Sequence, residues 1–214
     1  MKIDNIRHLL FDFDGTLIDS SRGVIIATNY ALKALGEPPR TDEEVKRFIG
    51  YPLEEMFHSF SNKPYREFWK HFQENGLSAI AASAEPVGEA DRVLDVLFKR
   101  GYVIGIGTTK MRVHVNKILE KLHWNHMVYA FVGADDVAKV KPAPEAYQKL
   151  LQMLGGKIDN SVVIGDTVND IQAARAGGLP AIGVSSPFGR ENDLQAARPD
   201  LFLHRLEELL EILK

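Results

Sequence analysis

Short apolar runs that alternate with helical patterns are the feature of this sequence that most restricts its fold. The runs are rich in β-branched and aromatic residues, and each is typical of a strand buried on both faces of a sheet. They cover residues 8–13, 102–107, 129–132, 162–165, 181–184 and 201–203. From residue 102 onward they alternate with segments whose apolar residues recur every three or four positions, over 113–122, 144–154, 170–176 and 206–213. This alternation predicts an α/β fold with a doubly wound parallel sheet.

The interval between the first two apolar runs contains helical patterns only. Helices are predicted over residues 20–35, 41–50, 52–57 and 64–72, and a further one over 86–99. Thr41 and Glu44 have the spacing of a capping box at the start of the second helix, and Gly76 is expected to close the fourth. The interval is therefore expected to contribute helices to the fold and no strand to the sheet.

A chain of 214 residues is long enough for a main domain that carries a smaller one. Because the helical interval interrupts the α/β alternation, we expect residues 17–82 to form an inserted, all-helical cap domain. The α/β core domain is then built from residues 1–16 and 83–214.

The overall charge excludes some classes of partner. The formal net charge is -3, so the protein has no global positive field for nucleic acid or an anionic membrane surface. The absence of cysteine excludes disulfides and thiolate metal sites. No apolar run approaches the length of a membrane span, and the first residues are unlike a secretory signal. We expect a cytoplasmic monomer or homodimer that acts on a small molecule.

Polar side chains suited to phosphoryl transfer lie close to the predicted strand ends. They are Asp12 and Asp14 in the first run, Thr108 and Thr109 after the second, Lys139 and Lys141 before the helix at 144–154, and Asp166 and Asp170 after the fourth run. The carboxyl ends of parallel strands meet at one edge, where ligands bind. A carboxylate there can attack phosphorus while hydroxyl and ammonium groups hold phosphate oxygens. Oxygen ligands favour Mg²⁺, whereas zinc prefers His and Cys.

Four segments, in this order, resemble the haloacid dehalogenase superfamily of phosphohydrolases. They are DFDGTLIDS at 12–20, the threonine at 108, the Lys-Pro pair at 141–142 and GDTVND at 165–170. The helical insertion after the first segment and the stretch DDVAKVKPAPEAY resemble the phosphoglycolate phosphatase-like branch. The resemblance spans essentially the whole chain. It implies a Rossmann-like core with a helical cap, and a Mg²⁺-dependent phosphatase that hydrolyses a small-molecule phosphate monoester through a phosphoaspartate.

The resemblance also implies roles in catalysis. Asp12 would be the nucleophile, and it would also bind the metal. Asp14 would protonate the leaving alcohol and then deprotonate the attacking water, while its backbone carbonyl binds the metal. Thr108 would donate its hydroxyl to the phosphate, and Lys141 would neutralise charge on Asp12 and the phosphoryl group. A proline follows Lys141 as in the family motif, which favours this residue over Lys139.

Further positions are implied for the metal and the substrate. Asp166 would complete the metal ligands, with Asp170 as a direct or water-mediated supporter. Thr109 follows the motif threonine and is a substrate-binding candidate, although the branch often has asparagine there. Arg47 and Tyr51 flank a predicted turn of the cap, and they are the candidates for contact with the leaving group of the substrate.

Several alternatives stay open at this point. A β-phosphoglucomutase-like phosphomutase would use the same core residues, and pyrophosphate is a further possible substrate. A phosphoacceptor signalling domain also combines acids, a hydroxyl, a lysine and magnesium, but it has no large cap. A haloalkanoic acid dehalogenase is disfavoured, because it would be expected to lack the acid at Asp14.

Overall fold

The computed structural model of the protein describes residues 5–188 and 190–214, so residues 1–4 of the predicted core segment lie outside the described part. Six strands form one sheet in the order β5-β4-β1-β6-β7-β8, and all neighbouring pairs are parallel. Their bounds are β1 His8–Phe11, β4 Val103–Gly107, β5 Val128–Val132, β6 Ser161–Gly165, β7 Ala181–Val184 and β8 Leu201–Leu203. Each predicted apolar run coincides with one of them. The prediction of an α/β fold with a parallel sheet is confirmed.

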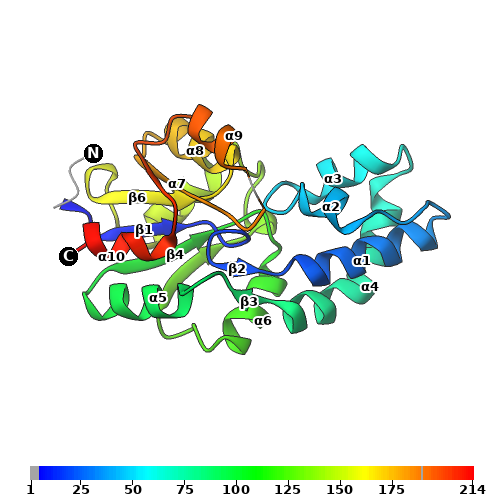
Figure 1. Cartoon of the computed structure of the whole chain (residues 1–214), viewed down its shortest axis with the longest axis horizontal. Helices are drawn as coiled ribbons and strands as arrows, with labels where there is room; N and C mark the ends of the chain where they lie inside the picture. Colours follow the sequence, from blue (N-terminus) through cyan, green and yellow to red (C-terminus); the bar gives the residue numbers. More distant parts are fainter. Residues whose placement is uncertain (1–4, 189) are drawn as a thin grey trace.

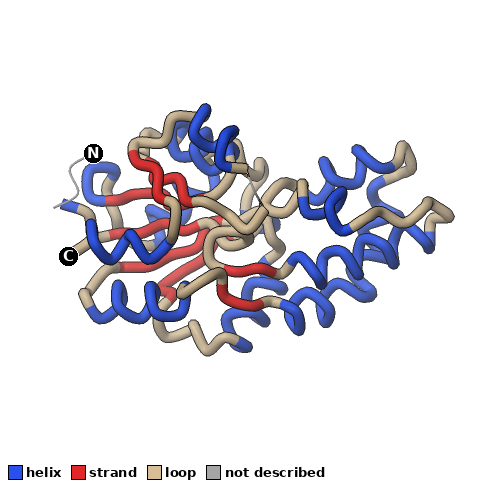
Figure 2. Tube along the Cα trace, viewed as in Figure 1, coloured by secondary structure: helices blue, strands red, loops and turns tan. Residues whose placement is uncertain are grey.

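Helices cover both faces of this sheet (Figure 2). They are α5 Ala90–Lys99, α6 Arg112–Lys121, α7 Glu145–Met153, α8 Val168–Ala176, α9 Glu191–Ala196 and α10 Leu209–Ile212, with short 3-10 turns at Ala134–Asp136, Ile158–Asn160 and Leu206–Glu208. Alternate residues of a strand point to opposite faces. Leu9 and Phe11 therefore pack in the core with α5, α6 and α10, whereas Leu10 packs with α7 and α8.

The inserted segment is helical and lies beyond one end of the sheet (Figure 1). It contains α1 Ser21–Ala34, α2 Asp42–Lys46, α3 Leu53–Phe60 and α4 Tyr65–Ser83. The predicted capping box starts α2, because Thr41 Oγ1 accepts from the Glu44 amide at 3.2 Å and a Glu44 carboxylate oxygen accepts from the Thr41 amide at 2.8 Å. Two short strands, β2 Ile18–Asp19 and β3 Glu85–Pro86, pair antiparallel where the chain enters and leaves the helices.

Some predicted boundaries were wrong. α4 does not end at Gly76 but continues to Ser83, because it packs along α1 and tertiary contacts override the low helix propensity of glycine. The helix predicted from residue 86 starts at Ala90, since Pro86 belongs to β3. Neither the two-residue strands nor α9 were predicted. None of the helices in the described residues combines the length and the apolar character that crossing a bilayer requires.

The close approach of α1 and α4 depends on Gly23. A Cβ atom at this position would lie 2.5 Å from the carbonyl oxygen of Ala79 and 2.5 Å from the Cα of Ile80, so backbone atoms leave no room for it. At Gly76, by contrast, the nearest atom would be in the Phe72 ring, at 3.2 Å.

Gly23→Ala is expected to destabilise the protein by about 1–3 kcal/mol, because the two helices must separate. This should occur although alanine favours an isolated helix by about 1 kcal/mol over glycine. Urea unfolding followed by circular dichroism measures the change. Gly76→Ala is the matched control and should stay within about 1 kcal/mol of the parent. Equal effects of the two substitutions would contradict the packing argument.

Candidate active site

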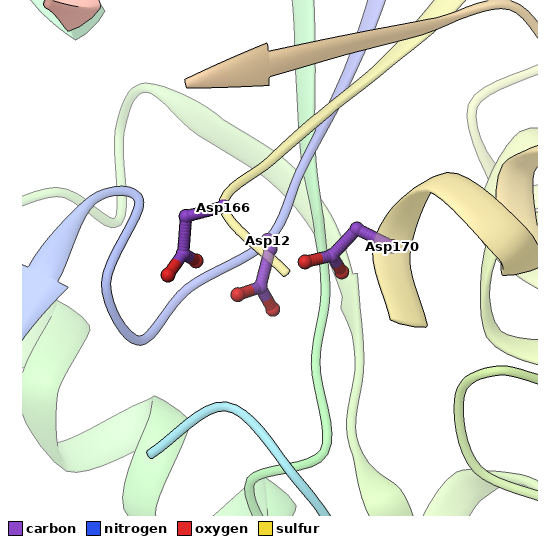
Figure 3. Close-up of side chains that lie close together, drawn as sticks. All are labelled: Asp12, Asp166 and Asp170. Atoms are coloured by element: carbon purple, nitrogen blue, oxygen red, sulfur yellow. The ribbon is translucent and has the colours of Figure 1, made fainter. Parts of the chain in front are cut away.

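Three buried carboxylates meet at the carboxyl end of the sheet. Asp12 follows β1, Asp166 follows β6, and Asp170 lies in the first turn of α8. One oxygen from each lies within 4.8 Å of the others, and all three residues are at most 1% exposed (Figure 3). Such a cluster is costly to bury unless cations compensate it.

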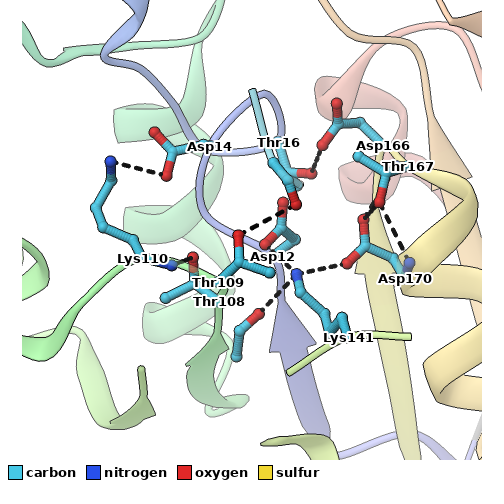
Figure 4. A network of polar contacts seen from close by, with 12 residues as sticks. Asp12, Asp14, Thr16, Thr108, Thr109, Lys110, Lys141, Asp166, Thr167 and Asp170 are labelled. Carbon is cyan, nitrogen blue, oxygen red and sulfur yellow. Dashed lines mark hydrogen bonds and ion pairs between the residues drawn. The ribbon is translucent and has the colours of Figure 1, made fainter. Parts of the chain in front are cut away.

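The ammonium group of Lys141 lies inside this cluster. It contacts Asp12 Oδ1 and donates to Asp170 Oδ1 at 2.6 Å and to the carbonyl oxygen of Gly107 at 3.1 Å (Figure 4). The side chain is fully buried, whereas Lys139 is exposed. The structure therefore brings Lys141, and not Lys139, to the carboxylates.

Asp170 is held by several donors. Its Oδ1 also accepts from the Tyr147 hydroxyl at 2.8 Å, and its Oδ2 accepts from the Thr167 amide at 3.0 Å and the Thr167 hydroxyl at 2.6 Å. Burial alone would raise its pKa, but the Lys141 charge and these hydrogen bonds hold the pKa of Asp170 below its usual value. Asp170 is thus an ionised partner that orients Lys141, and it also caps α8.

Asp166 is enclosed by the loop that follows β1. Thr16 donates to its Oδ1 at 3.0 Å, and the Arg190 guanidinium lies 3.2 Å from its Oδ2. Gly15 passes so close that a Cβ atom there would lie 2.4 Å from Asp166 Oδ2, and its φ of +93° also favours glycine. Burial, opposed by the Arg190 charge and reinforced by Asp170, raises the pKa of Asp166 to about 6.

The two carboxylate oxygens of Asp12 differ in their hydrogen bonding. Its Oδ2 is buried, and it has no hydrogen-bond partner among the described residues. Burial and the neighbouring Asp170 raise the pKa of Asp12 well above its usual value, with Lys141 acting in the opposite direction. When all three carboxylates are ionised, they carry three negative charges, and Lys141 and Arg190 supply two positive charges. One negative charge is therefore left without a partner in this cluster. An unpaired carboxylate oxygen in an all-oxygen, negatively charged cluster fits a divalent cation such as Mg²⁺.

The Asp14 side chain points away from the cluster, toward the helical insertion. Its Oδ1 accepts from the Ser20 hydroxyl at 2.6 Å, and its Oδ2 lies 3.1 Å from the Lys110 ammonium (Figure 4). Asp14 therefore does not contribute its carboxylate to the cluster. It lies between the cluster and a cavity of about 390 Å³ that extends into the insertion, which we call the cap cavity.

The remaining candidates occupy different surroundings. Thr108 is buried, and its hydroxyl oxygen accepts from the Lys110 amide at 3.1 Å, which leaves its proton free to be donated. Thr109 donates to the carbonyl oxygen of Gly50, at 3.1 Å. Tyr51 lines the cap cavity, with the Arg190 guanidinium 5.3 Å from the centre of its ring. Arg47 is exposed at the end of α2 and is not brought to the site.

Comparison with known proteins shows the family of the chain. A family model described as haloacid dehalogenase-like hydrolase matches residues 9–184. The chain belongs to this family. A relative from Bacillus cereus named pyrophosphatase PpaX is 32% identical over an alignment that covers all of this chain and 97% of the relative.

Solved structures share the whole fold of this chain. A haloacid dehalogenase-like hydrolase from Streptococcus pneumoniae superposes with a TM-score of 0.89, is 26% identical, and covers 99% of this chain and 100% of its own. A protein from Haemophilus somnus described as a predicted phosphoglycolate phosphatase has a TM-score of 0.85, is 22% identical, and covers 98% and 99% of the two chains. At that identity the second likeness shows the fold alone.

Six side chains that contact the aspartate carboxylates of the site were not named as site candidates from the sequence: Thr16, Ser20, Lys110, Tyr147, Thr167 and Arg190. Thr16 lies within the DFDGT segment and Tyr147 ends the DDVAKVKPAPEAY stretch, so the motifs themselves contained the signal. Lys110 directly follows the two candidate threonines. Arg190 lies in the loop between β7 and α9, and no local pattern connects it with Asp166.

The raised pKa of Asp166 predicts how stability depends on pH when no metal is bound. An aspartate has a pKa of about 3.9 in the unfolded chain, so the folded chain binds this proton more tightly. Stability in EDTA should therefore rise as the pH falls from above 6 toward about 4.5. Thermal unfolding across this range measures the effect.

Asp166→Asn is the control for this experiment, because asparagine does not titrate. Relative to the parent, the variant should be more stable near neutral pH, and this advantage should shrink as the pH falls. A stability difference that does not change with pH would contradict the predicted pKa shift.

Proposed function

We propose that this hydrolase is a Mg²⁺-dependent phosphatase that acts on a small-molecule phosphate monoester through a phosphoaspartate on Asp12. The observation that carries the proposal is the state of the Asp12 carboxylate. One of its oxygens is held by Lys141, while the other is buried without a hydrogen-bond partner in the described part of the chain, beside two further carboxylates. We further propose that residues 17–82 act as the cap of a core formed by residues 1–16 and 83–214, in a cytoplasmic protein.

The first chemical step is an attack of an Asp12 oxygen on phosphorus. A bond forms between this oxygen and phosphorus, and the bond between phosphorus and the alcohol oxygen breaks with its electron pair going to that oxygen. Asp14 supplies the proton that completes the leaving alcohol. Its side chain is suited to this role because Ser20 and Lys110 hold it on the cavity side of the cluster.

The second step returns Asp12 to its starting form. A water molecule attacks the phosphorus of the phosphoaspartate and gives a proton to Asp14. The bond between phosphorus and the Asp12 oxygen then breaks, the carboxylate leaves, and inorganic phosphate is released. The buried position of Thr108 and Lys141 suits them to donate hydrogen bonds to the phosphoryl oxygens in both steps.

Mg²⁺, held by Asp12, Asp166 and the backbone carbonyl of Asp14, would neutralise charge on the phosphoryl group. Asp170 has both oxygens engaged by Lys141, Tyr147 and Thr167, so its role is to hold Lys141 against Asp12.

Hydrolysis of pyrophosphate is the second candidate function. Relatives that are 30–32% identical over nearly the whole chain are named pyrophosphatase PpaX. The same core chemistry would serve that reaction, with phosphate in place of the alcohol as leaving group. The release of inorganic phosphate distinguishes a phosphatase from a phosphomutase or a signalling domain, because neither of these releases it steadily from simple esters.

Asp12→Asn is expected to lower the hydrolysis of p-nitrophenyl phosphate with MgCl₂ on the order of a thousandfold or more, because the nucleophile is lost. EDTA should likewise abolish turnover by the parent. Asp159→Asn, at an exposed aspartate before β6, is the control and should keep full activity. Full activity in the Asp12→Asn variant would refute the mechanism. A stable phosphoprotein that never releases phosphate would instead support a signalling domain.

The two neighbouring lysines provide a matched pair. Lys141→Met removes the ammonium that contacts Asp12, so kcat/KM for the same ester should fall roughly 100-fold or more. Lys139→Met changes an exposed lysine two residues away and should leave kcat/KM unchanged. Circular dichroism shows whether each variant is folded. Similar losses in both variants would contradict the assigned position of Lys141.

A further inference from the structure

The cap cavity begins at the catalytic centre and extends into the helical insertion. Residues from the segment 48–56 and from α1 and α4 line it on the insertion side. The core side is lined by Asp14, Thr109, Lys110, Met111, His114, Ala134 and Val140. Its volume of about 390 Å³ lies within the range of small-molecule sites, roughly 300–1,000 Å³. The cavity is therefore large enough for an organic group and not only for a phosphate.

The walls contributed by the insertion are mainly hydrocarbon and aromatic rings. Tyr51, Leu53, Met56, Tyr65, Trp69 and Phe72 all line the cavity. The rings of Trp69 and Phe72 stack with their centres 6.0 Å apart. The centre of the Tyr65 ring, on the same helix, lies 6.4 Å from the centre of the Trp69 ring. These contacts hold the rings of α4 in place as one wall.

Among the described residues that line the cavity, three of the four carboxyl, amino and imidazole groups are paired or neutral before a substrate binds. The Lys110 ammonium is paired with Asp14, at 3.1 Å. Burial and the nearby Lys110 lower the pKa of His114 to about 4, so this lining residue is neutral at neutral pH. The remaining charged residue in the described lining is the acidic Glu54. Arg190 is engaged by Asp166 and by the carbonyl oxygen of Ile49.

The position of Asp14 determines which part of a substrate enters the cavity. This step rests on the proposed function, in which Asp14 protonates the oxygen of the leaving group. Because the Asp14 side chain lies on the cavity side of the carboxylate cluster, the atoms beyond that oxygen extend into the cap cavity. An anionic group that extends among the apolar side chains of the insertion, near the acidic Glu54, would lose its hydration.

We propose that the cap cavity selects phosphate monoesters whose alcohol carries an uncharged apolar group, preferably an aromatic ring. Esters with a second anion, such as phosphoglycolate, and pyrophosphate are then poor substrates. The chain would differ in this respect from its relatives named pyrophosphatase, although the core residues are suited to either reaction.

The test compares kcat/KM of the parent enzyme for 2-phenylethyl phosphate, ethyl phosphate, phosphoglycolate and pyrophosphate, with acetyl phosphate as a small reference. The first two compounds have alcohols of similar basicity and differ mainly in apolar surface. Burial of the ring should favour 2-phenylethyl phosphate over ethyl phosphate roughly 10- to 100-fold. Phosphoglycolate and pyrophosphate should be no better than ethyl phosphate.

Two substitutions in the cavity wall sharpen the test. Trp69→Ala should lower the ratio of kcat/KM for 2-phenylethyl phosphate to that for ethyl phosphate about 10-fold, since it removes a ring from the wall. Leu53→Arg, at a partly exposed position, adds a cation and should raise kcat/KM for phosphoglycolate relative to 2-phenylethyl phosphate. Tyr129→Ala is the control, because this tyrosine is 73% exposed on β5 and does not line the cavity.

The outcomes separate this inference from the function on which it rests. Hydrolysis of acetyl phosphate with equal kcat/KM for the ethyl and phenylethyl esters, or with pyrophosphate preferred, overturns the inference and keeps the phosphatase. No turnover of any compound overturns both. The substrate series in the parent decides the question even where a variant fails to fold.

Discussion

The contact of the Lys141 ammonium with Asp12 and Asp170 is the interaction on which the rest of the site depends. Two carboxylates so close together inside a protein repel each other, and burial opposes the ionisation of both. The ammonium group favours the charged form of both, and the neighbouring carboxylates in turn raise the pKa of Lys141. The lysine is therefore kept charged in a buried place where an isolated ammonium would lose its proton.

The side chains around this contact give the three aspartates different numbers of hydrogen-bond partners. Asp170 accepts hydrogen bonds from several donors, and Asp166 is contacted by a threonine and an arginine. One oxygen of Asp12 has no hydrogen-bond partner within residues 5–188 and 190–214. Asp12, which has the fewest partners among the described residues, is the acid that we propose as the nucleophile. The negative charge that the protein does not compensate would favour a bound divalent cation, as the proposed function requires.

Much of the core could be predicted from the sequence because its signals are local. Strand runs alternate with helices along the chain. Period-two alternation after the first strand predicts that the Asp12 and Asp14 carboxylates lie on the same side, but the Asp14 carboxylate points away from the cluster. The topology of a parallel sheet then brings Asp166 beside Asp12. The contribution of Arg190 could not be predicted, since it comes from a loop 24 residues away in sequence from its partner. The length of α4 depends on its packing against α1. The helix propensity of Gly76 gives no information about this packing.

The pairing of β2 with β3 limits how the helical insertion can move. The chain enters and leaves the insertion through neighbouring residues, with Ile18 opposite Pro86 and Asp19 opposite Glu85. β2 and β3 are the two connections between the insertion and the core, and they lie side by side. Such a pair permits rotation of the insertion about the axis of the two strands more readily than translation. Any such rotation displaces the far helices most and Asp14, four residues before β2, least. Asp14, which we propose as the proton donor, thus lies near this pivot, so a rotation would change the width of the cavity more than the distance from Asp14 to Asp12.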